Sequence, residues 1–160
     1  MQRARPMCMG PGMVRGWSEM MELSFSTSCS TIDWNRVAEI LKTVGMSCHA
    51  PEIHRKAFEA SHTTIFVHSG EMLIGFGRAL SDGQYQAAIY DCAVLPEYQG
   101  RGVGSEIIRR VVEQLAHCNI ILYAAPGREG FYRQHGFARM KTGMALFLEM
   151  DSKRQRGFIE

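Results

Sequence analysis

Three glycines alternate with other residues at positions 100, 102 and 104, directly before a long amphipathic stretch. Glycines without a Cβ atom let backbone amides converge on an anion, and a helix N-terminus adds about half a positive charge there. Arg101 supplies a full charge beside these amides, and the hydroxyl of Ser105 can donate to a phosphate oxygen. The spacing therefore predicts a loop that binds a diphosphate.

Two common nucleotide-binding fingerprints do not fit this loop. A Walker loop needs four residues between two glycines, followed by a lysine, and the chain has neither feature here. A Rossmann fingerprint needs a third glycine where Ile107 stands, and an acidic residue about 20 positions on, where the chain has Ala124 and Ala125. The ligand is therefore a diphosphate bound in another way.

Residues 99–104 read Gln-Gly-Arg-Gly-Val-Gly and resemble the Q/R-x-x-G-x-G/A signature of the Gcn5-related N-acetyltransferase (GNAT) superfamily. A second family element is similar to residues 131–137, which read Phe-Tyr-Arg-Gln-His-Gly-Phe. The resemblance covers residues 21–150 and is strongest over 87–137. It implies an N-acetyltransferase that uses acetyl-CoA as donor and a primary amine, on a small molecule or a peptide, as acceptor.

The resemblance also implies which residues bind the donor. The backbone of Ala93, Val94 and Leu95 would bind the pantetheine arm like an added strand, and amides near Val94 would polarise the thioester carbonyl. The residues implied for the diphosphate are Gln99, Gly100, Arg101, Gly102, Val103, Gly104 and Ser105.

Tyr132 is similar to the family tyrosine that protonates the departing CoA thiolate. In water a tyrosine has a pKa of about 10 and a thiol about 8.5, so this transfer has little driving force unless the site lowers the pKa of the tyrosine. The alternative is a purely structural role, in which Tyr132 is a half-buried aromatic residue beside Phe131.

No general base is evident. Positions that carry a carboxylate or histidine in some relatives hold Ala88 and Tyr90. Strand alternation points Asp91 away from the face of Tyr90 and Cys92 unless a β-bulge intervenes, so we interpret Asp91 as structural. Glu97 could reach the cleft mouth or be an exposed loop charge, and a water relayed through Tyr90 is equally compatible.

Cys92 would suggest a ping-pong mechanism if its thiolate were stabilised, but no histidine or lysine lies near it in the sequence. Direct attack in a ternary complex is therefore favoured, with Tyr90 and Cys92 on the acceptor side. Because no base is evident, a catalytically silent acyl-CoA-binding or regulatory module is the alternative. It would bind acetyl-CoA but would transfer the acetyl group to no amine, so no free CoA would be released.

Hydrophobic periodicity indicates the elements that must position these residues. Period-2 patterns predict strands at 21–26, 63–68, 72–80, 86–95, 120–125, 137–141 and 144–150. Period-3.6 patterns predict helices at 33–44, 51–60, 103–116 and 127–135. Together with the resemblance, they predict a single α+β domain with three α/β/α layers. Its twisted sheet is mixed and mainly antiparallel, has six or seven strands, and splays to form the acetyl-CoA cleft.

Composition narrows the remaining possibilities. The 160 residues carry a formal charge of +2, which gives no argument for nucleic acid or a membrane surface as a partner. Five scattered cysteines fit neither a disulfide framework nor a zinc site, so we expect no metal and a cytoplasmic location. Residues 1–20 are predicted as a tail, 21–150 as the acetyltransferase domain and 151–160 as a solvated charged tail. The resemblance allows a homodimer, but the residues identify no interface.

Overall fold

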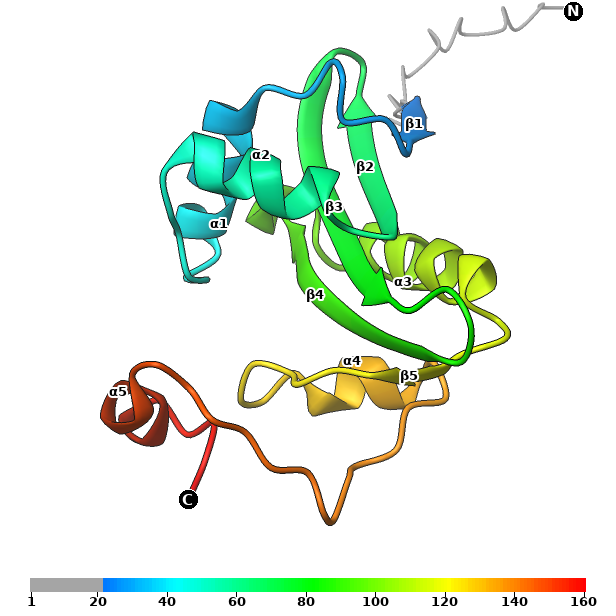
Figure 1. The fold of residues 1–160 in the computed structure, drawn as a ribbon. Helices are drawn as coiled ribbons and strands as arrows, with labels where there is room; N and C mark the ends of the chain where they lie inside the picture. The colour runs from blue at the N-terminus through cyan, green and yellow to red at the C-terminus, as the bar shows by residue number, and fades with distance from the viewer. Residues whose placement is uncertain (1–21) are drawn as a thin grey trace, which may run out of the picture.

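The computed structural model describes residues 22–160, so the tail predicted at 1–20 lies outside it. The described chain is an α+β fold in which helices cover both faces of a five-stranded sheet (Figure 1). The strands are β1 (Leu23–Ser26), β2 (Thr63–Ser69), β3 (Met72–Ser81), β4 (Gln86–Val94) and β5 (Asn119–Ile121). The helices are α1 (Trp34–Thr43), α2 (Pro51–Glu59), α3 (Val103–Gln114), α4 (Glu129–Arg133) and α5 (Met150–Gln155).

The sheet is mixed and mainly antiparallel, as predicted. Its order is β1-β2-β3-β4-β5, and the first four strands pair antiparallel, while β4 and β5 run parallel. Short turns join β2 to β3 and β3 to β4, whereas α1 and α2 lie between β1 and β2. The turn between β2 and β3 contains Gly70 with φ +59°, a conformation that favours glycine. The strand count is five in the described chain, below the six or seven expected.

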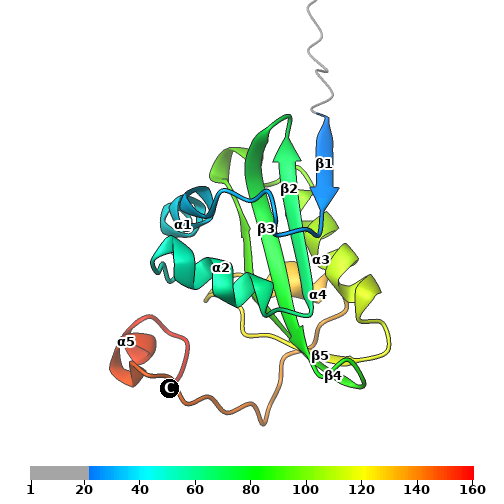
Figure 2. The same ribbon diagram turned by 45° about the horizontal axis from the view of Figure 1, so that its top comes forward.

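Helices α1 and α2 lie on one face of the sheet and α3 lies on the other (Figure 2). Asp33 begins α1 as its N-cap by accepting a hydrogen bond from the amide of Asn35 at 2.9 Å. The core fills the space between these layers. Its largest fully buried side chains include Phe58, Phe66, Phe76, Ile40, Leu41, Ile74, Ile107, Ile108 and Leu115.

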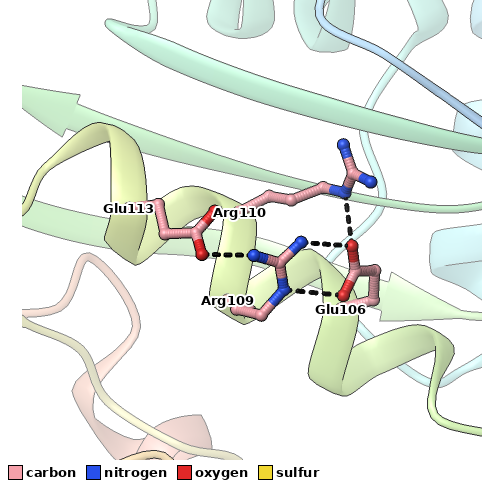
Figure 3. Close-up of polar contacts among 4 residues, drawn as sticks. All are labelled: Glu106, Arg109, Arg110 and Glu113. Carbon is pink, nitrogen blue, oxygen red and sulfur yellow. Dashed lines mark hydrogen bonds and ion pairs between the residues drawn. The ribbon is translucent and has the colours of Figure 1, made fainter.

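Helix α3 has the most regular division between an apolar and a charged face. Its buried face consists of Val103, Ile107, Ile108 and Val111, in agreement with the amphipathic helix predicted over 103–116. On the other face Glu106 pairs with Arg109 at 2.6 Å and with Arg110 at 2.7 Å, and Arg109 also pairs with Glu113 (Figure 3). The hydrogen bonds from the two arginines lower the pKa of Glu106 to about 2, so this carboxylate stays ionised at neutral pH.

The chain after β5 differs from the prediction. The expected strand at 120–125 pairs only over Asn119–Ile121, and no strand forms over 137–149, so both later strand predictions are wrong. Because β5 ends at Ile121, the sheet offers no long neighbouring edge with which these segments could pair. In consequence the alternating apolar side chains of Met144, Leu146 and Leu148 are 96%, 93% and 106% exposed.

The C-terminal residues 151–160 start as a helix and not as an extended tail, while Arg154 and Arg156 are exposed as expected for solvated charge. They begin within α5, and the side chains of Lys153 and Phe158 are partly buried. The guanidinium of Arg156 donates to the backbone carbonyl of Gly45 at 3.2 Å. This bond connects the end of the chain to the loop that follows α1.

Candidate functional site

A cleft opens where β4 and β5 separate. Their register contains three pairs, from Gln86 with Asn119 to Ala88 with Ile121. Beyond Ala88, β4 keeps β3 on one side and borders a cleft of about 800 Å³ on the other. The cleft is the place where the sequence predicted the donor to bind between two parted strands.

A β-bulge changes the direction of β4 within this cleft. One residue of β3, Gly77, stands opposite two residues of β4, Asp91 and Cys92, and Asp91 has φ +49°. The simple alternation expected from the sequence is therefore wrong here, and Asp91 lines the cleft together with Tyr90 and Cys92.

The carboxylate of Asp91 is ion-paired in the cleft wall. It accepts from the Nε of Arg78 at 2.6 Å, and both side chains are largely buried, with exposed fractions of 14% for Arg78 and 24% for Asp91. The guanidinium of Arg78 also lies 5.4 Å from the ring centre of Tyr90. This arrangement fixes the bulge and is consistent with a structural role for Asp91.

The glycine loop has the geometry of an anion site. Gly100 and Gly102 have φ +73° and +84°, and a Cβ atom at either position would meet no atom within 4 Å, so the space beside them is open. The first hydrogen bond of α3 runs from the amide of Glu106 to the carbonyl of Gly102 at 2.9 Å. The amides of the first turn, at residues 103–105, are therefore donors that the helix itself does not use. These residues fit the diphosphate of CoA.

Gly104 faces α4, unlike Gly100 and Gly102. A Cβ atom there would lie 3.4 Å from Cζ of Phe131, an ordinary van der Waals contact, so α4 packs closely against the start of α3. The next residue of α4 is Tyr132. The glycine motif and the predicted tyrosine are thus connected by direct packing.

The end of β4 is already hydrogen-bonded within the protein. The side-chain amide of Gln99 donates to the carbonyl of Val94 at 2.8 Å, and the amide of Leu95 donates to the carbonyl of Ile74 at 2.9 Å. Gln99 therefore holds the loop against the strand. Leu95 is in the core with an exposed fraction of 4%, and it does not line the cleft.

Tyr132 is partly buried in the cleft wall. Its ring lies 5.1 Å from that of Phe131 and 6.0 Å from that of Phe137. Burial, and secondarily the charge that Cys92 would carry, raises the pKa of Tyr132 above its ordinary value. The site therefore keeps this hydroxyl protonated and does not lower its pKa.

Cys92 has the electrostatics of a core thiol. Burial, with a smaller contribution from the neighbouring Asp91, raises the pKa of Cys92 to about 12. The thiol is therefore protonated at neutral pH and is a poor nucleophile.

The structure brings most of the predicted site residues into one cleft. The predicted residues that line it are Tyr90, Cys92, Ala93, Val94, Gln99, Gly100, Gly102, Gly104, Ser105 and Tyr132. Leu95, Arg101 and Val103 are not among the lining residues. The guanidinium of Arg101 lies 5.9 Å from the ring centre of Tyr98, and the side chain of Val103 is in the core. Glu97 is exposed and does not line the cleft, so it is not a base candidate.

Sequence reasoning missed the residues of the opposite wall. Tyr123, Lys153, Arg156 and Phe158 all line the cleft, and they come from segments predicted as a buried strand or as solvated charge. These four residues belong to no recognisable sequence motif. The only signal in the sequence is the clustering of basic and aromatic residues near the C-terminus.

Two negative findings apply to residues 22–160. No helix in this part of the chain is long and apolar enough to cross a membrane. Within the same residues no group of three or more histidine, cysteine or acidic side chains is placed to hold a metal ion.

Similar solved structures share this fold. A Staphylococcus aureus protein of unknown function superposes with a TM-score of 0.71 at 24% identity, covering 79% of this chain and 99% of that one. A GNAT-family acetyltransferase from Streptococcus pneumoniae superposes with a TM-score of 0.68 at 22% identity, covering 79% of this chain and 98% of that one. At these identities the likeness establishes the fold alone.

The sequence comparisons go further. Serotonin N-acetyltransferase 2, chloroplastic, of Oryza sativa subsp. japonica is 34% identical over 130 residues, which are 76% of this chain and 65% of the rice protein. GCN5-related N-acetyltransferase 1, chloroplastic, of Arabidopsis thaliana is 39% identical over 86 residues, which are 52% of this chain and 44% of that protein. The chain thus spans less than two thirds of the length of these two relatives. The model of the acetyltransferase (GNAT) family matches residues 29–137, more than half of the chain and including both the glycine loop and Tyr132, and the chain belongs to this family.

Proposed function

We propose that this protein transfers the acetyl group of acetyl-CoA to a primary amine by direct attack in a ternary complex. The observation that carries this proposal is the convergence of two features on one cleft. These features are a glycine loop with unused helix amides and a tyrosine whose hydroxyl is kept protonated. Membership of the acetyltransferase family supports the same reaction.

The loop and the first turn of α3 would bind the donor. Acetyl-CoA, when bound, supplies the activated thioester. The amides of residues 103–105 would donate to its diphosphate, with the positive end of a 12-residue helix behind them. Gln99 holds this loop against the end of β4, where Ala93 and Val94 border the cleft. The bond between Gln99 and Val94 therefore sets the distance between the diphosphate site and the strand.

Tyr132 would give its proton to the departing thiolate. A raised pKa makes the tyrosine a weaker acid. Burial also makes a thiolate in this cleft a stronger base, and it raises the pKa of the neighbouring Cys92 thiol in the same direction. The two effects oppose each other, so burial does not by itself disfavour the transfer.

The acceptor would enter from the side of Tyr90 and Cys92. An alkyl amine has a pKa near 10.4 in water and is mostly protonated at neutral pH, so it must lose a proton before it attacks. Tyr90 and the ion-paired Asp91 line this side of the cleft, and a water relayed through Tyr90 is our proposed route for that proton.

Thiol release tests the function directly. Purified full-length protein with acetyl-CoA is expected to release CoA thiol only when an amine is added, measured with a thiol reagent against a panel of alkyl amines, arylalkyl amines and lysine peptides. A reaction without amine corrects for hydrolysis. If calorimetry shows that acetyl-CoA binds, but no amine in the panel causes release of CoA thiol, the protein is the silent acyl-CoA-binding module instead.

Replacing Cys92 separates direct transfer from a ping-pong mechanism. We expect Cys92→Ala to keep kcat within about fivefold of the parent value, because a thiol with a pKa of about 12 is not the acetyl acceptor. Mass spectrometry of the parent protein after incubation with acetyl-CoA alone should show no acetyl group on Cys92. Cys48→Ala, which changes an exposed cysteine, is the matched control. A loss of kcat of about 100-fold in Cys92→Ala alone would argue for a covalent acetyl-enzyme.

Location and assembly stay predictions. The cytoplasmic location was inferred from the cysteines, whereas the rice and Arabidopsis relatives are chloroplastic by name. We likewise propose that the protein has no nucleic-acid or membrane partner and that it can form a homodimer.

A further inference from the structure

An ammonium group of the protein itself is held by aromatic rings in the cleft. The Nζ of Lys153 lies 4.5 Å from the ring centre of Phe158, 5.0 Å from that of Phe147 and 5.8 Å from that of Tyr123. We refer to Tyr123, Phe147 and Phe158 as the aromatic cluster. Its rings meet edge to face, with Tyr123 5.5 Å from Phe147 and 5.9 Å from Phe158.

The rings hold this cation without an acidic partner. Among residues 22–160, Lys153 forms no ion pair, while its neighbour Arg154 pairs with Asp151 at 2.9 Å. Attraction of an ammonium ion to aromatic faces is the interaction by which proteins bind ammonium ligands. The aromatic cluster is therefore an ammonium site by its chemistry. Lys153 contacts all three rings, and the guanidinium of Arg156 also lies 5.3 Å from the ring centre of Phe158.

The aromatic cluster belongs to the same cleft as the proposed catalytic groups. Tyr123, Phe158 and Lys153 line the cleft that Tyr132 also lines. The ring of Tyr123 lies 6.2 Å from that of Tyr90, the residue next to the bulge in β4. The aromatic cluster thus borders the acceptor side of the cleft.

The position of Lys153 in the fold allows its ammonium group to leave the aromatic cluster. It stands on a helix of six residues, α5, at the end of the unpaired segment 137–149, and its ammonium is carried on a flexible four-carbon chain. The bond from Arg156 to the carbonyl of Gly45 keeps α5 beside the cleft. The ammonium of Lys153 can therefore leave the aromatic cluster by side-chain rotation while α5 stays in place.

We propose that the aromatic cluster is a binding subsite for the cationic group of the acceptor, and that Lys153 competes for it as an intramolecular occupant. This proposal rests on the proposed function, because it takes the ligand to be the amine acceptor. It narrows the acceptor to molecules that carry a compact alkylammonium group besides the amine that is acetylated, because the reacting amine must lose its proton before it attacks. An acceptor would displace the ammonium of Lys153 from the three rings and take its place there.

Tetramethylammonium tests this proposal without any acetyl transfer, because it has the charge of the ligand but cannot be acetylated. Its binding to the full chain can be followed by NMR shifts of isotope-labelled protein, with sodium chloride holding ionic strength constant. We expect Lys153→Met to lower the Kd about three- to tenfold, because the competing cation is removed, and Phe158→Leu to raise it by a similar factor. Lys141→Met, which changes an exposed lysine, should leave it unchanged.

The outcomes separate the two proposals. Equal affinity in Lys153→Met and the parent protein, or in Phe158→Leu and the parent, would overturn the subsite even if thiol release with amines is normal. Tighter binding in Lys153→Met would support the subsite even if no amine releases thiol, in which case only the transferase assignment fails. Thermal unfolding of each variant excludes misfolding, and Lys153→Gln gives a second neutral replacement that should bind as tightly as the methionine variant.

Discussion

Gly102→Val is expected to remove CoA binding, with a loss of affinity of at least about 100-fold. Valine at φ +84° is strained by about 1–2 kcal/mol or more, so the loop would move away from the geometry that aims the helix amides. The added side chain would also occupy open space that the diphosphate needs. Two lost hydrogen bonds to a charged group, at about 1.5–3 kcal/mol each, already account for this factor. Titration calorimetry with CoA measures it.

A second glycine provides the control for this experiment. Gly70 also has a positive φ, of +59°, and open space around its missing Cβ, but it lies in the turn between β2 and β3 and does not line the cleft. Gly70→Val should therefore lower stability in a similar way and leave CoA affinity unchanged. If Gly102→Val bound CoA as tightly as the parent protein, the diphosphate would have to bind elsewhere.

Tyr132→Phe is expected to lower kcat by about 100-fold or more, while the KM for acetyl-CoA and the melting temperature change little. The hydroxyl is the proposed acid, and general acid catalysis contributes about 100- to 10,000-fold. The phenylalanine ring keeps the contacts with Phe131 and Phe137. Steady-state kinetics with saturating amine gives kcat, and thermal unfolding checks the fold.

The raised pKa of Tyr132 adds a test by pH. A group whose pKa is raised stays protonated to higher pH, so loss of activity through ionisation of this tyrosine should begin only above about pH 10. Tyr85→Phe removes an exposed hydroxyl outside the cleft and should change neither kcat nor the pH profile. A Tyr132→Phe enzyme with full kcat would leave the aromatic ring a structural role only.

Strands β2 to β4, helix α3 and the glycine loop could be predicted from the sequence because their signals are local. The apolar runs of β2 and β3 are buried almost continuously, and the stripe of α3 forms one buried helix face, so these elements follow from the local hydrophobic pattern. The glycine loop is also local, since positive φ values at Gly100 and Gly102 require that residue type. Tyr132 was found through its place in a family motif and not through any physical pattern.

The parts that could not be predicted depend on contacts distant in sequence. The bulge at Asp91 arises where Gly77 of β3 meets two residues of β4, and alternation within β4 gives no sign of it. The last segments have good strand patterns, but a strand also needs a neighbouring edge, and β5 ends at Ile121. The position of Lys153 depends on aromatic side chains between 5 and 30 residues away.

The short pairing of β4 with β5 separates the cleft into two walls, one formed by the strands up to β4 with the glycine loop and the other by the chain after β5. Three register pairs join the two strands, and the wall that carries Tyr123, Phe147 and Lys153 otherwise meets the rest of the fold through side-chain contacts, such as that of Tyr123 with Tyr90. Replacing that wall would leave the pairing of the first four strands intact. Under the proposed function, selectivity for one amine or another could therefore diverge between paralogues, or be redesigned in the laboratory, while the part proposed to bind the donor is kept.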